Sequence, residues 1–188
     1  MNTKHKVLSL FSGCGGMDIG FEGGFQCLCR SINTKLHPTW IEETNGNWAT
    51  VKKTGFITVF ANDIRPDAKA AWVSYFGQSI CNANEIYHVD SIVDLVKRAK
   101  SGENIFPDHI DVVTGGFPCQ DFSVAGKRKG FNSEKSHNGE KLNVGEPTIE
   151  SRGQLYMWMR EVVSLVKRVR FLNCVNVEKR HNCSVIIS

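Results

Sequence analysis

The sequence predicts an α/β protein with a mostly parallel sheet and helices on both of its faces. Segments typical of strands and of helices alternate along the 188 residues, which is the pattern of parallel strand–helix–strand units. Three of the predicted strands run into glycine-rich or polar loops, after Phe11, at Asp63 and at Cys119. Because ligands of such folds bind beyond the carboxyl ends of the strands, we expect these three loops to share one functional edge.

Each predicted strand is a short apolar run that ends at a turn signal. "KVLSLF" (6–11) runs into "SGCGG", and "FITVFAND" (56–63) joins β-branched and aromatic residues to an Asn-Asp pair. "HIDVVTGGFP" (109–118) is a strong strand-to-loop signal. We predict a shorter strand within 85–92 and one more at 169–177.

The predicted helices show apolar positions at helical spacing together with end signals. A short helix is expected within "MDIGFEGGF", and a second over 66–77, with Pro66 in its first turn and Gly77 just past its end. A third covers 92–100, where either Asp90 or Ser91 is the expected N-cap. The clearest helix covers 153–168. The apolar faces of the last two consist of Ile92, Leu95, Val96 and Ala99, and of Leu155, Trp158, Met159, Val162 and Val166.

Composition is that of an ordinary globular domain, with 41% hydrophobic and 22% charged residues. The net charge of +4 hints only mildly at a polyanionic partner. No signal peptide or membrane span is recognised, and the 7 irregularly spaced cysteines predict reduced thiols in a cytoplasmic protein rather than a disulfide framework or a metal site. The polar segments 26–54 and 127–150 are interpreted as insertions.

The individual loops leave alternatives open when each is taken alone. "FSGCGG" matches neither the dinucleotide pattern G-x-G-x-x-G nor a phosphate loop, so it fits an ordinary tight turn about as well as a nucleotide loop. Asp63 and Asp90 suit ribose or base recognition, but also a turn or a helix cap. Cys119 follows Pro118 at a strand end, where a thiolate nucleophile and a buried structural thiol are both conceivable.

The order of four motifs resolves these alternatives by resemblance. "FSGCGGMDIGF", "FANDI", "GGFPCQDFSVAG" and "RGQLYMWM" together resemble the DNA cytosine C5-methyltransferases. The resemblance runs from about Val7 to Lys167, apart from the two expected insertions. It implies an S-adenosylmethionine-dependent methyltransferase (Rossmann-like) fold that is incomplete at the C-terminal end. Residues 1–167 would form the N-terminal part of the catalytic, cofactor-binding domain and 168–188 a divergent tail, with the target-recognition domain absent.

The same resemblance implies a set of residues that bind S-adenosyl-L-methionine. Asp63 stands where the family has its acidic ribose ligand, which is more often glutamate. Ile64 would pack on the adenine, and Asp90 would meet the adenine amino group. The positions matched to the cofactor are Phe11, Gly13, Gly15, Asp63, Ile64, Asp90 and Leu155.

For catalysis, the resemblance makes Cys119 the nucleophile that attacks C6 of a cytosine flipped out of double-stranded DNA. Pro118, Gln120 and Ser123 match positions near the target base. Lys127, Arg128 and Lys129 would meet phosphates, with a solvated charge cluster as the alternative. The implied function is that of a DNA cytosine C5-methyltransferase of a restriction-modification system.

The sequence departs from the family pattern near its C-terminal end. Val175 stands where the family has the glutamate of a Glu-Asn-Val motif, and Arg168 replaces an expected proline. We therefore expect an isolated chain that transfers little methyl: a truncated fragment, in which residues after Lys167 stem from a frameshift, or one subunit of a split enzyme with a complementing C-terminal polypeptide. An unusual source for the glutamate is a further alternative. An RNA cytosine C5-methyltransferase of the same fold is the less favoured function.

Overall fold

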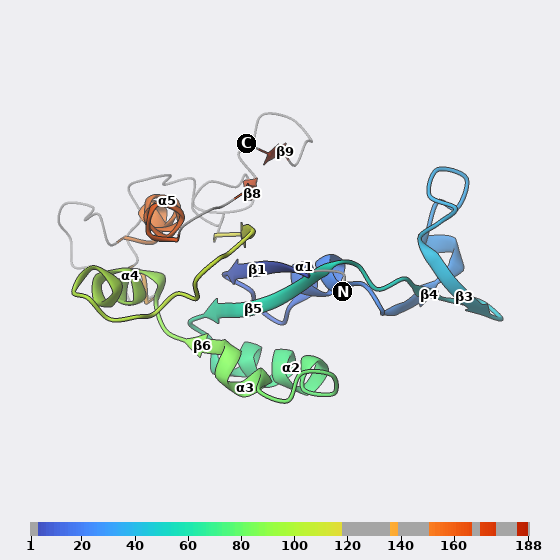
Figure 1. The fold of residues 1–188 in the computed structure, drawn as a ribbon, viewed down its shortest axis with the longest axis horizontal. Coiled ribbons are helices and arrows are strands. Elements are labelled where there is room, and N and C mark those ends of the chain that lie inside the picture. Colours follow the sequence, from blue (N-terminus) through green and yellow to red (C-terminus); the bar gives the residue numbers. More distant parts are fainter. Residues whose placement is uncertain (1–3, 118–135, 139–150, 167–169, 176–183, 188) are drawn as a thin grey trace.

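The fold centres on a six-stranded sheet of order β6-β5-β1-β7-β8-β9 (Figure 1). The computed structural model describes residues 4–117, 136–138, 151–166, 170–175 and 184–187. The strands are β1 (His5–Leu10), β5 (Phe56–Asp63), β6 (Tyr87–Val89), β7 (Val112–Gly115), β8 (Arg170–Val175) and β9 (Ser184–Ile187). All neighbouring pairs are parallel except β8 and β9. The predicted mostly parallel α/β sheet is confirmed.

Helices cover both faces of this sheet, as predicted. They are α1 (Gly16–Glu22), α2 (Pro66–Phe76), α3 (Ala83–Ile86), α4 (Ile92–Lys100) and α5 (Leu155–Leu165), with short 3-10 turns at Cys29–Ser31 (η1) and Arg152–Gln154 (η2). Successive residues of a strand point to opposite faces. Phe60 and Ala61 of β5 accordingly belong to two different hydrophobic clusters.

Each cluster joins one face of the sheet to its own helices. Leu8, Leu10 and Phe60 pack with buried residues of α4 and α5. On the other face, Ala61 packs with Trp72 of α2 and with α3, and Ile19 of α1 borders this group. The central strands β1 and β5 are therefore covered on both sides, which fixes the positions of the loops that follow them.

Element boundaries follow the sequence signals closely where those signals are local. Helix α4 coincides with the predicted range, and Ser91 is its N-cap, because its Oγ accepts a hydrogen bond from the amide of Val93 at 3.2 Å. Gly77 follows α2 directly, as predicted. Within the predicted strand-to-loop segment 109–118, strand β7 occupies Val112–Gly115, and His109, which has a left-handed φ of 58°, lies before it. Helix α5 is shorter than predicted, because its backbone becomes extended at Val166.

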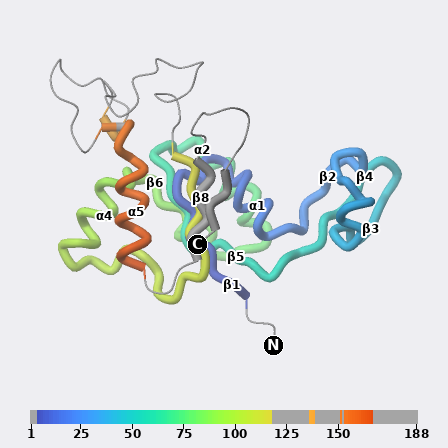
Figure 2. The backbone as a smooth tube through the Cα atoms, turned by 90° about the horizontal axis from the view of Figure 1, so that it is seen from above, coloured from blue at the N-terminus to red at the C-terminus, as the bar shows by residue number. Residues whose placement is uncertain are grey.

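Residues 26–54 contain a second, three-stranded antiparallel sheet that we call the lobe. Its strands are β2 (Gln26–Leu28), β3 (Ile41–Asn45) and β4 (Trp48–Val51), in the order β2-β4-β3. Both ribbon and tube views show the lobe extending to one side of the six-stranded sheet (Figures 1 and 2). The sequence predicted no strand here, and its status as an insertion relative to the family stays a prediction.

In the described part of the chain, no helix combines the length and apolarity that crossing a membrane requires. The same residues contain no cluster of three or more His, Cys, Asp or Glu side chains that suits a metal ion. Cys14, Cys27, Cys29 and Cys81 are free thiols.

Gly23, at the junction of α1 and the lobe, is a position where a side chain does not fit. Its φ is 66°, and an added Cβ would lie 2.1 Å from the carbonyl oxygen of Lys52. We expect Gly23→Ala to lower the free energy of unfolding by at least about 2 kcal/mol, through left-handed strain and a backbone clash. Urea denaturation provides the measurement.

Gly20 supplies a matched control on the same helix. An added Cβ there meets nothing within 4 Å, so Gly20→Ala should be neutral or raise stability by up to about 1 kcal/mol. Equal effects of the two substitutions would show that the junction does not constrain Gly23.

Candidate cofactor and catalytic site

The carboxyl ends of β1, β5 and β7 meet at one edge of the sheet. Leu10, the last residue of β1, is in register with Asn62 of β5 and with Gly115 of β7. From β1 the chain proceeds through β5 to β6, whereas β7 and β8 lie on the other side of β1. The strand order thus reverses between β1 and β7, and such a switch point is where open α/β sheets bind ligands.

The glycine loop after β1 is held in an unusual backbone conformation. Phe11, Gly13 and Gly15 have positive φ angles of 55°, 54° and 90°. Phe11 is not glycine, so its left-handed conformation is strained, and such strain is concentrated at functional sites. The amide of Ser12 donates to the carbonyl of Asn62 at 2.8 Å, which ties the loop to the end of β5.

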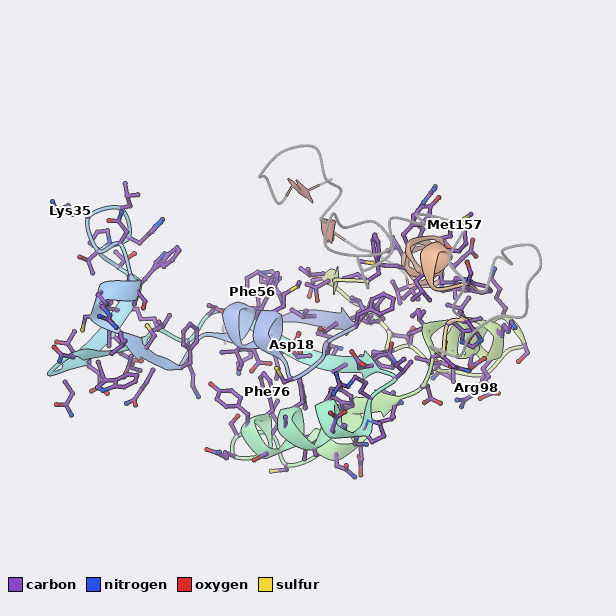
Figure 3. All side chains as sticks on the ribbon, turned by 180° about the vertical axis from the view of Figure 1, so that it is seen from behind. Asp18, Lys35, Phe56, Phe76, Arg98 and Met157 are labelled. Atoms are coloured by element: carbon purple, nitrogen blue, oxygen red, sulfur yellow. The ribbon has the colours of Figure 1, made fainter. Side chains whose placement is uncertain are left out.

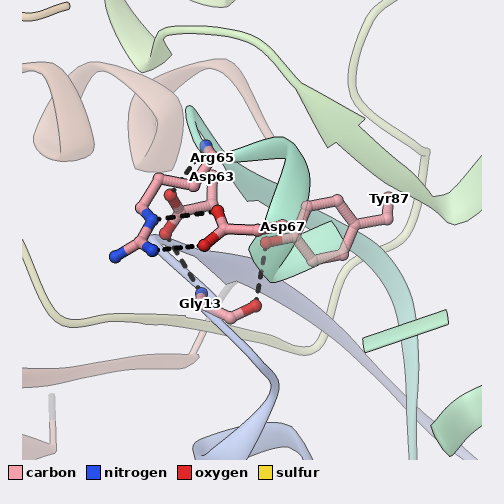
Figure 4. A network of polar contacts seen from close by, with 5 residues as sticks. All are labelled: Gly13, Asp63, Arg65, Asp67 and Tyr87. Atoms are coloured by element: carbon pink, nitrogen blue, oxygen red, sulfur yellow. Dashed lines mark hydrogen bonds and ion pairs between the residues drawn. The ribbon is translucent and has the colours of Figure 1, made fainter. Parts of the chain in front are cut away.

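Asp63 connects the end of β5 to this loop through both of its carboxylate oxygens. Oδ2 accepts a hydrogen bond from the amide of Gly13, and Oδ1 accepts one from the amide of Arg65, each at 3.1 Å (Figure 4). An ionised carboxylate offers about four acceptor sites. Asp63 therefore has the turn-forming role that was one of the two alternatives for it. Its carboxylate also retains sites that can accept a hydrogen bond from a ligand hydroxyl.

Tyr87 of β6 holds the loop from the opposite side. Its hydroxyl donates to the carbonyl of Gly13 at 2.8 Å (Figure 4). Burial, reinforced by the negative charge of Asp63, raises the pKa of Tyr87 above its ordinary value. The phenol consequently stays protonated and remains a hydrogen-bond donor, so Gly13 is fixed at both its amide and its carbonyl.

The residues that follow Asp63 present an apolar surface beside charge. Ile64 is 43% exposed. The exposed ion pair of Arg65 and Asp67 lies next to it, and the hydrogen bond from Arg65 lowers the pKa of Asp67 (Figure 4). An exposed aliphatic side chain adjacent to a carboxylate suits the ring face and the hydroxyl groups of a nucleoside.

Asp90 lies at the end of β6, beside the end of β5. The carboxamide of Asn62 donates to the carbonyls of His88 and Asp90 at 3.2 and 2.8 Å, so it fastens the two strand ends together. Since Ser91 caps α4, helix capping does not occupy Asp90. The glycine loop, Asp63 and Asp90 thus lie at the carboxyl ends of three adjacent strands.

Leu155 has a core position beside the glycine loop. It is 3% exposed and belongs to the cluster against which Phe11 packs. The end of β7 is held close by, because an added Cβ on Gly115 would lie 2.7 Å from Cε of Met159 and 3.4 Å from Cβ of Leu10. The segment that leads toward Cys119 therefore starts from a fixed point at this edge.

The predicted nucleophile and the residues predicted to contact the target base and the DNA phosphates fall outside the described residues. These are Pro118, Cys119, Gln120, Ser123, Lys127, Arg128 and Lys129. Val175 ends β8, whose Asn173 is in register with Gly115 of β7. The backbone position predicted to carry the family's glutamate thus belongs to the same edge as the glycine loop.

Several residues that shape this site were not singled out from the sequence. Asn62, Tyr87 and the buried pair of Asp18 and Trp72 act through contacts between distant segments. Asn62 is adjacent to Asp63 and is buried on the strand, so a buried amide before a strand-end acid was an available signal. Nδ1 of His137 lies 2.6 Å from Oγ of Ser91, and no sequence pattern around His137 indicated this contact.

The family model for C-5 cytosine-specific DNA methylase matches residues 44–142, more than half of the chain. This chain belongs to that family. The methylase family was the one expected from the glycine loop, "FANDI" and the Pro-Cys-Gln motif.

Type II methyltransferases from bacteria are among the relatives of this chain. M.NgoFVII from Neisseria gonorrhoeae is 28% identical, covering 72% of this chain and 25% of the relative. M.Bsp6I from Bacillus sp. (strain RFL6) is 32% identical, covering 70% and 28%. M.NgoPII from Neisseria gonorrhoeae is 27% identical, covering 96% and 36%, so its alignment reaches into residues 168–188. The chain spans roughly a quarter to a third of the length of these relatives.

We expect protonation of His88 to contribute to the pH dependence of the free energy of unfolding. Burial lowers the pKa of His88, opposed by the charge of Asp90, and its ring stacks on Phe60 with centroids 4.4 Å apart. The unfolded chain therefore binds the proton at higher pH than the folded one, and the unfolding free energy falls as pH drops below about 6.5. His88→Phe should show a shallower loss between about pH 7 and 5 in urea denaturation; identical slopes would exclude this role.

Proposed function

We propose that this chain binds S-adenosyl-L-methionine at the carboxyl edge of its sheet and belongs to an enzyme that methylates cytosine at C5 in double-stranded DNA. Family membership supports the reaction class. The observation that carries the cofactor proposal is the hydrogen bond from the Gly13 amide to Asp63, next to the exposed face of Ile64. This arrangement offers a glycine backbone, a carboxylate and an apolar surface at one place.

The described residues fit the proposed cofactor in shape and chemistry. An added Cβ on Gly13 would meet nothing within 4 Å, so the loop is open on that side. Asp63 would accept from the ribose hydroxyls, Ile64 would pack on the adenine, and Asp90 would meet its amino group. Phe11, Gly13, Gly15 and Leu155 would line the remaining part of the site. When bound, the cofactor supplies a methyl group on a positively charged sulfur.

For the chemical step we propose that Cys119 acts as the nucleophile. Its thiolate would form a bond to C6 of the flipped cytosine, which makes C5 nucleophilic enough to take the methyl group. Loss of the C5 proton to a base then expels the thiolate and restores the aromatic ring. Pro118, Gln120 and Ser123 would hold the target base, and Lys127, Arg128 and Lys129 would bind the DNA backbone.

A restriction-modification role is supported by the Type II methyltransferases among the relatives. Val175, at the position matched to the family's glutamate, favours a second candidate, a cofactor-binding part that methylates DNA only together with another polypeptide. Both candidates require the same cofactor site and differ in methyl transfer by the chain alone.

Cofactor binding is tested by calorimetry with S-adenosylhomocysteine. We expect the 188-residue chain to bind it, and Asp63→Ala to weaken binding about tenfold or more, because a charged hydrogen-bond acceptor is lost. Asp67→Ala is the matched control: it removes a neighbouring carboxylate that pairs with Arg65 and should leave the affinity nearly unchanged. A wild-type chain that fails to bind would refute the proposal.

Methyl transfer is tested with radiolabelled S-adenosylmethionine, using duplex DNA and tRNA in parallel. We expect negligible incorporation by the chain alone and, after addition of a complementing polypeptide, incorporation into duplex DNA that Cys119→Ser abolishes. Robust transfer by the chain alone would rule out the need for a partner. Label in tRNA rather than DNA would overturn the substrate assignment.

A further inference from the structure

A buried polar pair lies directly beneath the glycine loop. Asp18 of α1 and Trp72 of α2 are both 0% exposed. Nε1 of Trp72 donates a hydrogen bond to Oδ2 of Asp18 at 2.7 Å. In Figure 3, Asp18 is labelled where α1 faces α2, close to Phe76. Neither member of the pair has a role in the function proposed above.

Gly15 packs directly against the indole of Trp72. An added Cβ on Gly15 would lie 2.6 Å from Cδ1 and 3.0 Å from Nε1 of Trp72. Gly15, with a φ of 90°, also precedes α1 as its N-cap. A rotation of the indole would therefore displace Gly15 and the first turn of α1.

The same indole contacts the residue that holds Gly13. The rings of Trp72 and Tyr87 have centroids 5.5 Å apart, and the hydroxyl of Tyr87 donates to the carbonyl of Gly13. Trp72 also stacks on Phe76, with ring centroids 4.2 Å apart. The orientation of one side chain thus affects both glycines of the loop, directly at Gly15 and through Tyr87 at Gly13.

Asp18 orients this indole at a cost to the folded state. Burial raises the pKa of Asp18 above its ordinary value, although the hydrogen bond from Trp72 and the nearby hydroxyls of Ser9 and Ser12 oppose this rise. Its Oδ1 has no partner with hydrogen-bond geometry in the part of the chain that the structure describes. A buried acid with an unsatisfied oxygen does not favour folding, and such groups gather at functional sites.

We propose that Asp18 is a positioning residue for the cofactor loop: by fixing the indole of Trp72, it sets the backbone of Gly15 and, through Tyr87, that of Gly13. The inference rests on the proposed function in one respect, that this loop binds S-adenosylmethionine. Asp18 does not touch the cofactor, since it is fully buried.

The test compares four variants of the pair and one control variant, each shown to be folded by circular dichroism at the temperature used. Asp18→Ala removes the acceptor, Trp72→Phe removes the donor, and their double variant removes both. Asp18→Asn keeps an acceptor oxygen but no charge. Val96→Ala is a control in α4: Val96 is 0% exposed and belongs to the cluster on the opposite face of the sheet from Trp72 and Tyr87, so this change should lower stability without altering the contacts of Trp72.

Two measurements are made on every variant. Affinity for S-adenosylhomocysteine should fall about tenfold in Asp18→Ala and in Trp72→Phe, and no further in the double variant, because the two changes remove one interaction. Asp18→Asn should return the affinity to within about threefold of wild type. Hydrogen exchange of the amides at 12–16 should accelerate about tenfold in Asp18→Ala relative to that in Val96→Ala.

The outcomes separate this inference from the proposed function. If wild type binds no cofactor but exchange at 12–16 still responds to Asp18→Ala, the positioning role holds and the proposed function fails. If wild type binds and Asp18→Ala binds equally well, with exchange no faster than in Val96→Ala, the inference is wrong. Independent, additive losses in the double variant would also overturn it.

Discussion

The hydrogen bond between the Gly13 amide and the carboxylate of Asp63 is the interaction on which the candidate site depends. It joins the loop after β1 to the end of β5, 50 residues apart in sequence. It forms only because the two strands are parallel and in register, so that both loops leave the sheet at one edge. The pairing of β1 with β5 in the core thereby fixes the position of the Gly13 backbone at the surface.

That position is defined by packing from below as well as by the bond itself. One face of the sheet carries α4 and α5, and the other carries α1, α2 and α3. The glycine loop passes over the second group, where Trp72 and Phe76 leave no space for a side chain on Gly15. Glycine is needed here for two separate reasons, the positive φ and the close aromatic contact.

The sequence predicted most of what is local and periodic. Helix α4 was placed to the residue because its apolar face and its cap are both short-range signals, and the order of strands and loops was enough to bring Gly13 and Asp63 to one edge. The strands of the lobe were missed because β3 is nearly all exposed, so it shows no alternation between apolar and polar residues. Asp18 and Trp72 were missed because they lie 54 residues apart, and only the packing of α1 on α2 brings them together.

The lobe is attached at the end of the sheet opposite the candidate site. Its two ends are hydrogen-bonded to each other: the amide of Gly24 donates to Val51, and the amide of Thr54 donates to Glu22, at 3.0 and 2.9 Å. When the two ends of a segment are already held together, a change in its length alters the entropic cost of loop closure only slightly. Folding therefore constrains the length and the sequence of the lobe only weakly. The lobe enters from the end of α1 and returns to the start of β5, at the amino end of the strands. We therefore expect that the lobe can be exchanged for another module, or a foreign domain inserted at the same point, without disturbing the glycine loop.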